Sequence, residues 1–171
     1  FGEHTGNFAH DNATGYRSVT GFLGVLRDSA AWRNGIGIDF DGGDLHGNAA
    51  YGNVTTGITI RRAGTFAGNR AYGNGVGIQF AATGTTSTVR NNLIYDNQVA
   101  GLELVGAQSG IGAGPVAITN NTIVETSGAD AIRARSASEQ IQLKNNIVSV
   151  AGAGKFALNV DADSQQGFAS N

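Results

Sequence analysis

A motif anchored on asparagine returns along the whole chain and constrains its fold more than any other feature. Each copy has an anchor residue, a small or aliphatic residue two positions later and, in most copies, a further Asn five positions later. The anchors are Asn7, Ser29, Asn48, Asn69, Asn92, Asn121 and Asn146, followed by Asn171. They lie 19 to 29 residues apart, a spacing typical of one supersecondary unit per repeat. The sequence therefore predicts a solenoid.

Each repeat also carries three apolar stations. The first lies three residues before the anchor and, from the second copy on, comprises Leu26, Leu45, Phe66, Val89, Ile118, Leu143 and Phe168. The second lies two residues after it and comprises Ala9, Ala31, Ala50, Ala71, Ile94, Ile123 and Val148. The third alternates apolar and polar residues, as in GIDF at 37–40, GITI at 57–60 and GLEL at 101–104. Such alternation is typical of a half-buried strand.

Short strands joined by Gly-rich turns, with no helical segment between them, predict a parallel β-coil. We expect about seven coils of three short strands, stacked at the spacing of paired strands, roughly 4.8 Å. The recurring Asn side chains are expected to bond to one another and to nearby backbone at a corner of every coil. Asn7, Asn48, Asn69, Asn92, Asn121 and Asn146 would then form a ladder, in which Asn48, Asn69 and Asn92 are expected to be mostly buried.

The repeat consensus, as in VRNNLIYDNQVAGLEL and ITNNTIVETSGADAIRA, resembles that of the right-handed parallel β-helix family of pectate-lyase-type solenoids. The resemblance covers essentially the whole chain and implies an all-β, single-stranded parallel β-helix spanning residues 1–171 as one domain. It specifies architecture rather than activity, because the family includes lyases, hydrolases, epimerases, tailspikes and adhesins. Solenoids need caps, and none is evident here. We therefore expect a piece of a longer protein, with further coils or neighbouring subunits at both ends.

Composition excludes several classes of function. With a net charge of −2 and 11 basic residues, the chain lacks the concentration of positive charge that is typical of nucleic-acid-binding proteins. The absence of Cys removes disulfides and thiolate metal sites. No apolar run reaches the length of a membrane span. Together with the repeat pattern, these features favour a secreted or cell-surface protein.

An acidic stretch after the second coil is the candidate metal site. Asp39, Asp41 and Asp44, beside His46, surround a Gly-Gly turn. Asp-rich flexible loops suit Ca²⁺, and the resemblance implies a Ca²⁺ that binds a uronate carboxylate in the family's lyases. The alternative is a polar corner in which Asp and Gly only form the turn.

Two arginines one coil further on, Arg61 and Arg62, are the candidate catalytic or substrate-binding residues. Arg binds a uronate carboxylate well but does not readily lose a proton, so it makes a poor base. The two lysines, Lys144 and Lys155, lie several coils away. Epimerases of similar fold use an Asp-Pro-His motif, which is missing because the single proline is Pro115. His4 and His10 align with structural columns, so we interpret both as structural.

A column of rings, three residues after successive anchors, is the candidate carbohydrate contact. It comprises His10, Trp32, Tyr51, Tyr72 and Tyr95, which stacked coils would bring to about 5 Å from one another. Facing outward, Trp32, Tyr51, Tyr72 and Tyr95 would provide a platform for sugar rings; facing a corner, they would only stiffen it. A second column is also expected to point outward: Asp39, Thr59, Gln79, Glu103, Arg133 and Asn159. The Gly-rich insertion at 106–115 carries no residue with evident chemistry.

Two functional hypotheses follow. The first is a non-catalytic extracellular β-helix segment of a surface, adhesive or carbohydrate-binding protein, with no cofactor and a polysaccharide or cell-surface glycan as partner. The second is a polysaccharide lyase or epimerase that acts on polyuronate with Ca²⁺. The missing caps, the regular coils and the absence of a lysine near the acidic stretch favour the first.

Overall fold

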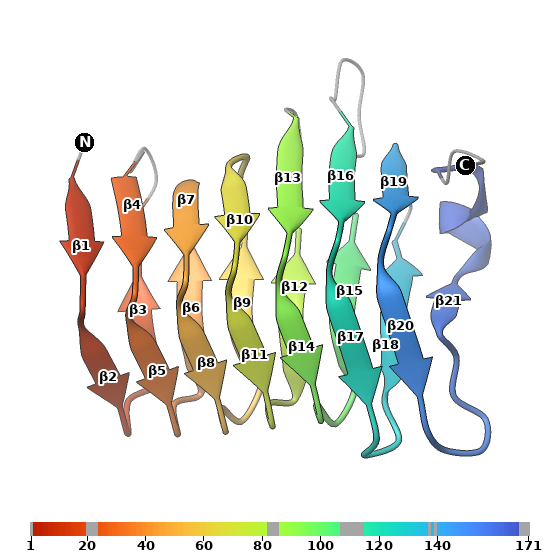
Figure 1. Ribbon diagram of the computed structural model, residues 1–171, viewed down its shortest axis with the longest axis horizontal. Coiled ribbons are helices and arrows are strands. Elements are labelled where there is room, and N and C mark those ends of the chain that lie inside the picture. The colour runs from red at the N-terminus through yellow and green to blue at the C-terminus, as the bar shows by residue number, and fades with distance from the viewer. Residues whose placement is uncertain are drawn as a thin grey trace.

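A computed structural model describes residues 2–19, 24–81, 86–106, 115–136, 138 and 140–167, although the side chains of residues 165–167 are not described. The chain winds into three parallel sheets of seven strands each, and every coil contributes one strand to each sheet (Figure 1). This arrangement confirms the predicted parallel β-helix of about seven coils. Asn171, Phe168 and most of the Gly-rich insertion lie outside the described residues.

We name the sheets A, B and C in the order in which each coil enters them. Sheet A contains β1 (Glu3–Thr5), β4 (Gly24–Arg27), β7 (Gly43–His46), β10 (Thr65–Ala67), β13 (Ser87–Arg90), β16 (Val116–Thr119) and β19 (Ile141–Lys144). Sheet B contains β2 (Phe8–His10), β5 (Ala30–Trp32), β8 (Ala49–Tyr51), β11 (Arg70–Tyr72), β14 (Leu93–Tyr95), β17 (Thr122–Glu125) and β20 (Ile147–Val150). Sheet C contains β3 (Thr14–Arg17), β6 (Ile36–Phe40), β9 (Thr56–Ile60), β12 (Val76–Phe80), β15 (Ala100–Val105), β18 (Asp130–Arg135) and β21 (Leu158–Val160). A 3₁₀ helix, η1 (Ala162–Gly167), follows β21.

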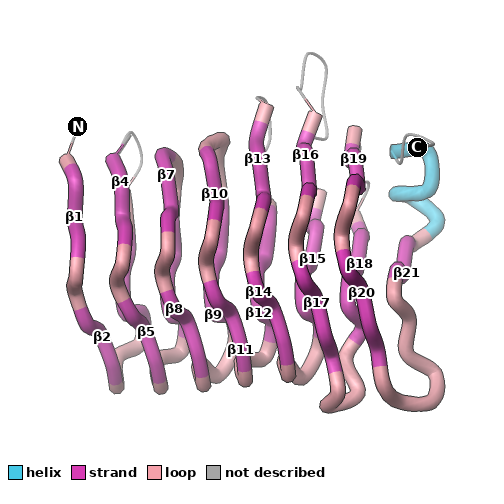
Figure 2. The backbone as a smooth tube through the Cα atoms, viewed as in Figure 1, coloured by secondary structure: helices cyan, strands magenta, loops and turns pink. Residues whose placement is uncertain are grey.

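Two residues connect sheet A to sheet B in every coil (Figure 2). The residue before each ladder anchor has a positive φ, between 51° and 67°. Those residues are Gly6, Asp28, Gly47, Gly68, Asn91, Asn120 and Asn145. Gly, Asn and Asp are the residues that tolerate this left-handed conformation, which explains why the repeat opens on GN, DS or NN.

The anchors form the predicted ladder at this corner. In the central coils, the backbone N–H and the Nδ2 of Asn48 both donate to Asn69 Oδ1, at 3.0 and 3.1 Å. Asn69 repeats this pattern with Asn92. Asn48, Asn69, Asn92 and Asn121 are at most 2% exposed. Asn7 in the first coil is exposed, and Asn146 in the last is half-buried.

A second ladder fills the corner between sheets B and C. It comprises Asn12, Asn34, Asn53, Asn74 and Asn97, the further Asn of each repeat. Its last rung is not Asn but Glu125, whose Oε2 and Oε1 accept hydrogen bonds from the N–H and Nδ2 of Asn97 at 2.6 and 2.9 Å. Glu125 is fully buried. The ladder therefore ends on a buried carboxyl group.

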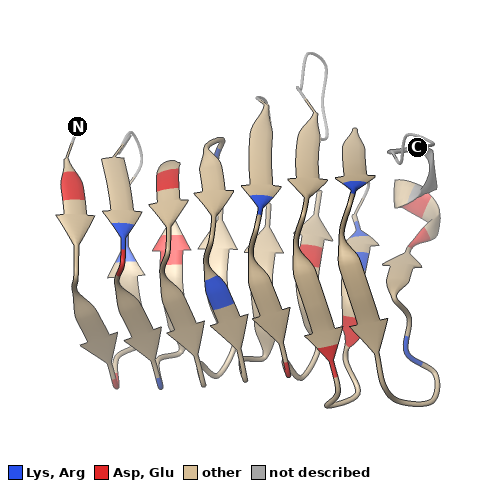
Figure 3. Cartoon of the chain, viewed as in Figure 1, with Lys and Arg blue, Asp and Glu red and all other residues tan. Residues whose placement is uncertain are grey.

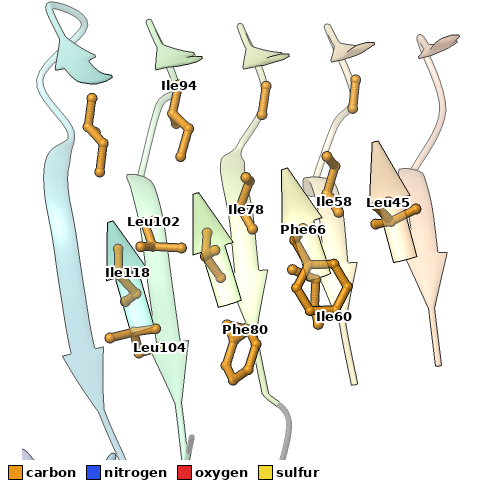
Figure 4. Close-up of a cluster of buried hydrophobic side chains, with 14 of the residues drawn as sticks. Leu45, Ile58, Ile60, Phe66, Ile78, Phe80, Ile94, Leu102, Leu104 and Ile118 are labelled. Carbon is orange, nitrogen blue, oxygen red and sulfur yellow. The ribbon is translucent and has the colours of Figure 1, made fainter. Parts of the chain in front are cut away.

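The core lies between the three sheets and is built from the predicted apolar stations (Figure 4). Sheet A contributes Leu45, Phe66 and Ile118, sheet C contributes Ile58, Ile78, Phe80, Leu102 and Leu104, and sheet B contributes Ala50, Ala71 and Ile94. Phe66 and Phe80 meet edge to face, with ring centroids 6.3 Å apart. His4 takes the position of these residues in the first coil, in register with Leu26, but it is exposed.

Candidate functional site

A polar pocket of about 440 Å³ opens on sheet C near the N-terminal end of the solenoid. It is lined by Arg17, Ser18, Val19, Asp39, Asp41 and Arg61. The structure thus brings together Asp39, Asp41 and Arg61, three of the residues singled out in the sequence. Figure 3 shows the basic and acidic segments of β3 and β6, which meet at this pocket.

Asp39 is the centre of the pocket's charges. Arg61 Nε donates to Asp39 Oδ1 at 2.5 Å, and Arg17 Nε lies 3.6 Å from Asp39 Oδ2. Asp39 points outward from the sheet as expected, yet its side chain is only 6% exposed. Two arginine side chains, one from each neighbouring coil, shield it from water. The hydrogen bond to Asp39 holds the pKa of Arg61 above its usual range, so Arg61 stays a cation.

Asp41 and Asp44, like Asp39, each have a partner in the fold. Asp41 Oδ2 lies 3.2 Å from Arg62 Nε, so this carboxylate also faces an arginine. Asp44 lies on β7 of sheet A, where its Oδ1 accepts the N–H of Thr65 and its Oδ2 is 4.0 Å from His46. Among the residues described, no three His, Asp or Glu side chains are grouped to hold a metal.

The pocket suits an anion better than a cation. Among the lining residues, Arg17 and Arg61 balance Asp39 and Asp41, and Arg62, which faces Asp41 from beside the pocket, gives the cluster one positive charge in excess. The three arginine side chains are about half exposed or more. Guanidinium groups bind carboxylates through two parallel hydrogen bonds. The residues that line the pocket include no lysine or histidine, so the described site offers anion binding without an evident base.

The aromatic column of sheet B is a continuous stack of rings. Centroids of successive rings lie 4.6, 5.8, 5.0 and 4.7 Å apart from His10 to Tyr95, and the Trp32, Tyr51, Tyr72 and Tyr95 planes are within 6° of parallel. These four side chains are half-buried. Because each inner ring stacks on its neighbours, its faces are largely occupied. A glycan on this surface would meet ring edges and hydroxyl groups more than free ring faces.

Removing one ring from the middle of this stack should lower stability. Tyr72 stacks on Tyr51 and Tyr95, so we expect Tyr72→Ala to cost about 1–3 kcal/mol in the free energy of unfolding, at about 0.5–1.5 kcal/mol per aromatic pair. Urea denaturation measures this loss. Tyr72→Phe, which preserves both stacks, is the matched control and should unfold like the wild type.

The histidines do not meet at the pocket. His10 stacks on Trp32 and its Nδ1 lies 2.6 Å from Asp11 Oδ2, while Arg33 contacts the same carboxylate through Nε and Nη2. The bonds from Arg33, and then from His10, lower the pKa of Asp11 to about 2. His46 lies on sheet A beside Asp44.

A family model described as a right-handed β-helix region matches residues 24–166. The chain belongs to the right-handed β-helix family. The match confirms the resemblance noted in the sequence. No curated protein matches this β-helix.

Two solved structures are similar in fold. One is the periplasmic alginate epimerase AlgG, as a T265N T268M double mutant, with a TM-score of 0.66 and 21% identity over 96% of this β-helix. The β-helix spans only 40% of that chain. The other is the A-module of the mannuronan C-5 epimerase AlgE4 from Azotobacter vinelandii, with a TM-score of 0.41 and 16% identity over 87% of this chain and 58% of that one. At these identities the likeness shows the fold alone.

Two features of the site went unnoticed in the sequence. Arg17 and Ser18 line the pocket, and Asp39 pairs with Arg61. The signal was present in the coil length: Asp39 lies 22 residues from both Arg17 and Arg61, which is one coil in each direction. Opposite charges one coil apart on an outward column are expected to pair across neighbouring strands.

Proposed function

We propose that this β-helix is a non-catalytic segment of a secreted or cell-surface protein that binds an acidic polysaccharide in the polar pocket of sheet C. The observation that carries the proposal is a cluster of three arginines that are about half exposed or more, Arg17, Arg61 and Arg62, around two aspartates that already face arginines. The likeness in fold to a periplasmic alginate epimerase supports a glycan partner and a location outside the cytoplasm. No helix in the described part of the chain is long and apolar enough to cross a membrane.

In this proposal the arginines bind carboxylates of the glycan. Arg61 contacts Asp39 through Nε, which leaves its terminal nitrogens for a second partner. Asp39 fixes the direction of that guanidinium group, so less side-chain entropy is lost on binding. Since the contact is between charges near the surface, affinity should fall as salt is added.

Removing the guanidinium group of Arg61 should weaken binding of polymannuronate. A charge-assisted hydrogen bond contributes about 1.5–3 kcal/mol, so we expect Kd to rise roughly ten- to a hundredfold. Arg61→Gln alone leaves the buried Asp39 with one arginine fewer and risks instability. The double variant Asp39→Asn/Arg61→Gln keeps the pair neutral, and calorimetric titration of both variants with polymannuronate measures the loss. Unchanged affinity in both would contradict the assignment.

The aromatic column is the other predicted glycan contact. Tyr72→Phe preserves the ring stack and removes one outward hydroxyl group, so it serves as the matched comparison for the Arg61 variants. With the glycan in the sheet C pocket, this change should leave Kd unaltered. A loss of affinity here, with the Arg61 variants unaffected, would move the binding site to sheet B.

A polyuronate epimerase or lyase that uses Ca²⁺ is the second candidate function, favoured by the fold of the alginate epimerase. Its best residues would be Asp39, Asp41 and Asp44 for the metal and Arg61 or Arg62 for the substrate carboxylate. Calorimetric titration with Ca²⁺ tests it: a saturating signal that disappears in Asp41→Ala would support this function, whereas no signal would remove it.

A further inference from the structure

A second cluster on sheet C repeats the arrangement around Asp39. Glu103 lies on β15, in the same outward column, and is only 1% exposed. Arg135 Nε lies 3.0 Å from Glu103 Oε1, Gln79 Nε2 donates to Glu103 Oε2 at 2.9 Å, and Arg133 is the register partner of Glu103 on β18. Figure 3 shows the acidic segment on β15 beside the basic segment on β18.

The two clusters share one geometry. In each, a buried carboxylate on the outward column contacts the Nε of an arginine that lies one coil further on and two residues beyond that column: Asp39 with Arg61, and Glu103 with Arg135. Arg61 and Arg135 are 49% and 44% exposed, so both keep their outer ends in solvent. In both arginines, the contact with the carboxylate thus holds Nε in place, while the outer end of the guanidinium group stays accessible to a ligand.

The separation of the clusters follows from the strand order. Arg61 follows β9 and Arg135 ends β18, and β12 and β15 lie between these strands in sheet C. Three strand spacings of about 4.8 Å place the two arginines roughly 14 Å apart along the axis of the solenoid. A strand spacing is close to the length of one sugar residue in an extended glycan. Between Asp39 and Glu103, the outward column of sheet C consists of Thr59 and Gln79, which carry no charge.

We propose that Arg135, with Arg133, forms a second carboxylate-binding subsite, so that an acidic glycan lies along the outer face of sheet C from Arg61 to Arg135. This inference rests on the proposed function and specifies its ligand as a polyuronate segment of at least four residues. Two subsites on one chain strengthen binding because the second contact forms at a high effective concentration. A shorter ligand reaches only one of them.

Two acidic residues near the second subsite, Asp161 and Asp130, oppose the binding of a negatively charged glycan. Asp161, half-buried on the next coil, accepts the N–H groups of Ser136 and Ser164. Hydrogen bonding to Ser164, and then to Ser136, lowers the pKa of Asp161, and the charge of Arg135 adds a smaller effect in the same direction. Asp130, on the same strand as Arg133, accepts hydrogen bonds from the N–H of Phe156 and from Asn159 Nδ2. Both carboxylates thus already have partners in the fold. Asp161→Asn should nevertheless strengthen glycan binding, because it removes a negative charge near Arg135.

The test is calorimetric titration with mannuronan oligosaccharides from the disaccharide to the octasaccharide. In the wild type, we expect affinity to rise by about tenfold once the ligand reaches four residues and spans both subsites. Arg135→Gln should abolish this step, while the disaccharide still binds at the pocket around Arg61. Because Arg135→Gln leaves Glu103 buried with fewer partners, Glu103→Gln/Arg135→Gln provides a neutral pair that keeps the hydrogen-bonding capacity of the site.

Arg90→Gln is the matched control for net charge. Arg90 ends β13 on sheet A, is exposed, and should have no effect on the length dependence. An affinity that does not depend on length, or a step that survives in both Arg135 variants, would overturn the second subsite while leaving the pocket intact. Failure of every oligosaccharide to bind would overturn both the subsite and the proposed function.

Discussion

Asn69→Leu should lower the melting temperature by roughly 10 °C. Asn69 lies in the middle of the first ladder and is 1% exposed. Its Oδ1 accepts from the N–H and Nδ2 of Asn48, and its Nδ2 donates to Asn92 Oδ1 and to the carbonyl of Leu45. Leu fills a similar volume but satisfies none of these groups. The coils above and below both lose hydrogen-bonding partners.

The size of the effect follows from the groups left unpaired. Each buried donor or acceptor without a partner costs about 1–3 kcal/mol, and the N–H of Asn48 and the carbonyl of Leu45 both lose one. A total of about 2–6 kcal/mol for the two groups is a large share of the 5–15 kcal/mol that stabilises a typical domain. For a chain of this length, each kcal/mol shifts the melting temperature by about 2–4 °C.

Thermal unfolding followed by circular dichroism measures this shift. Arg70→Ala is the control, because Arg70 is the next residue in the chain, is exposed on sheet B, and should change stability by less than about 0.5 kcal/mol. Gln79 is a poorer control than its outward position suggests, since it bonds to the buried Glu103. Equal melting temperatures for Asn69→Leu and Arg70→Ala would show that the ladder does not stabilise the fold.

The stability of this β-helix should fall as the pH rises from about 5 to about 8, because the second ladder ends on Glu125. Burial raises the pKa of Glu125 from 4.5 to about 7, against the opposing effect of the hydrogen bonds from Asn97 and with a further increase from the nearby Asp96. Between these two values the folded chain keeps a proton that the unfolded chain releases. This group therefore favours folding most below about pH 4.5, and its contribution is lost as the pH passes 7.

A difference of about 2.5 pKa units corresponds to about 3 kcal/mol. Glu125→Gln retains an acceptor for Asn97 and cannot ionise. The difference in unfolding free energy between the two proteins, measured by urea denaturation at several pH values, should favour Glu125→Gln by up to about 3 kcal/mol at pH 8 relative to pH 5. A difference that is constant with pH would show that Glu125 ionises normally in the folded chain.

The ladder and the core were predictable from the sequence because each repeat satisfies its own local rules. A left-handed residue, an anchor Asn and an inward aliphatic residue occur at fixed offsets, so Asn48, Asn69 and Asn92 were placed correctly. Asn7 begins the ladder, with its N–H bonded to Ser29 Oγ, but it is exposed because a buried rung needs a coil on each side and the described chain has none before it. Glu125 escaped notice because it lies four residues after its anchor, whereas Asn97 lies five after Asn92.

The site was harder to predict, because its interactions run between coils whose lengths vary. Asp39 looked like a metal ligand in the acidic stretch, but its nearest charged partners are one coil away on either side. The aromatic column was placed correctly as a column, yet sequence alone could not show that the ring faces stack on one another. Side-chain direction and pairing between coils both depend on the three-dimensional register.

The central claim, that this β-helix binds an acidic glycan without converting it, is tested most directly by one titration. Polymannuronate oligosaccharides followed by proton NMR, with and without Ca²⁺, report binding through line broadening and conversion through new sugar signals. We predict saturable broadening that is lost in Asp39→Asn/Arg61→Gln, and spectra that otherwise stay constant over time. The appearance of epimerised or unsaturated residues, or spectra that never change on addition of the protein, would contradict it.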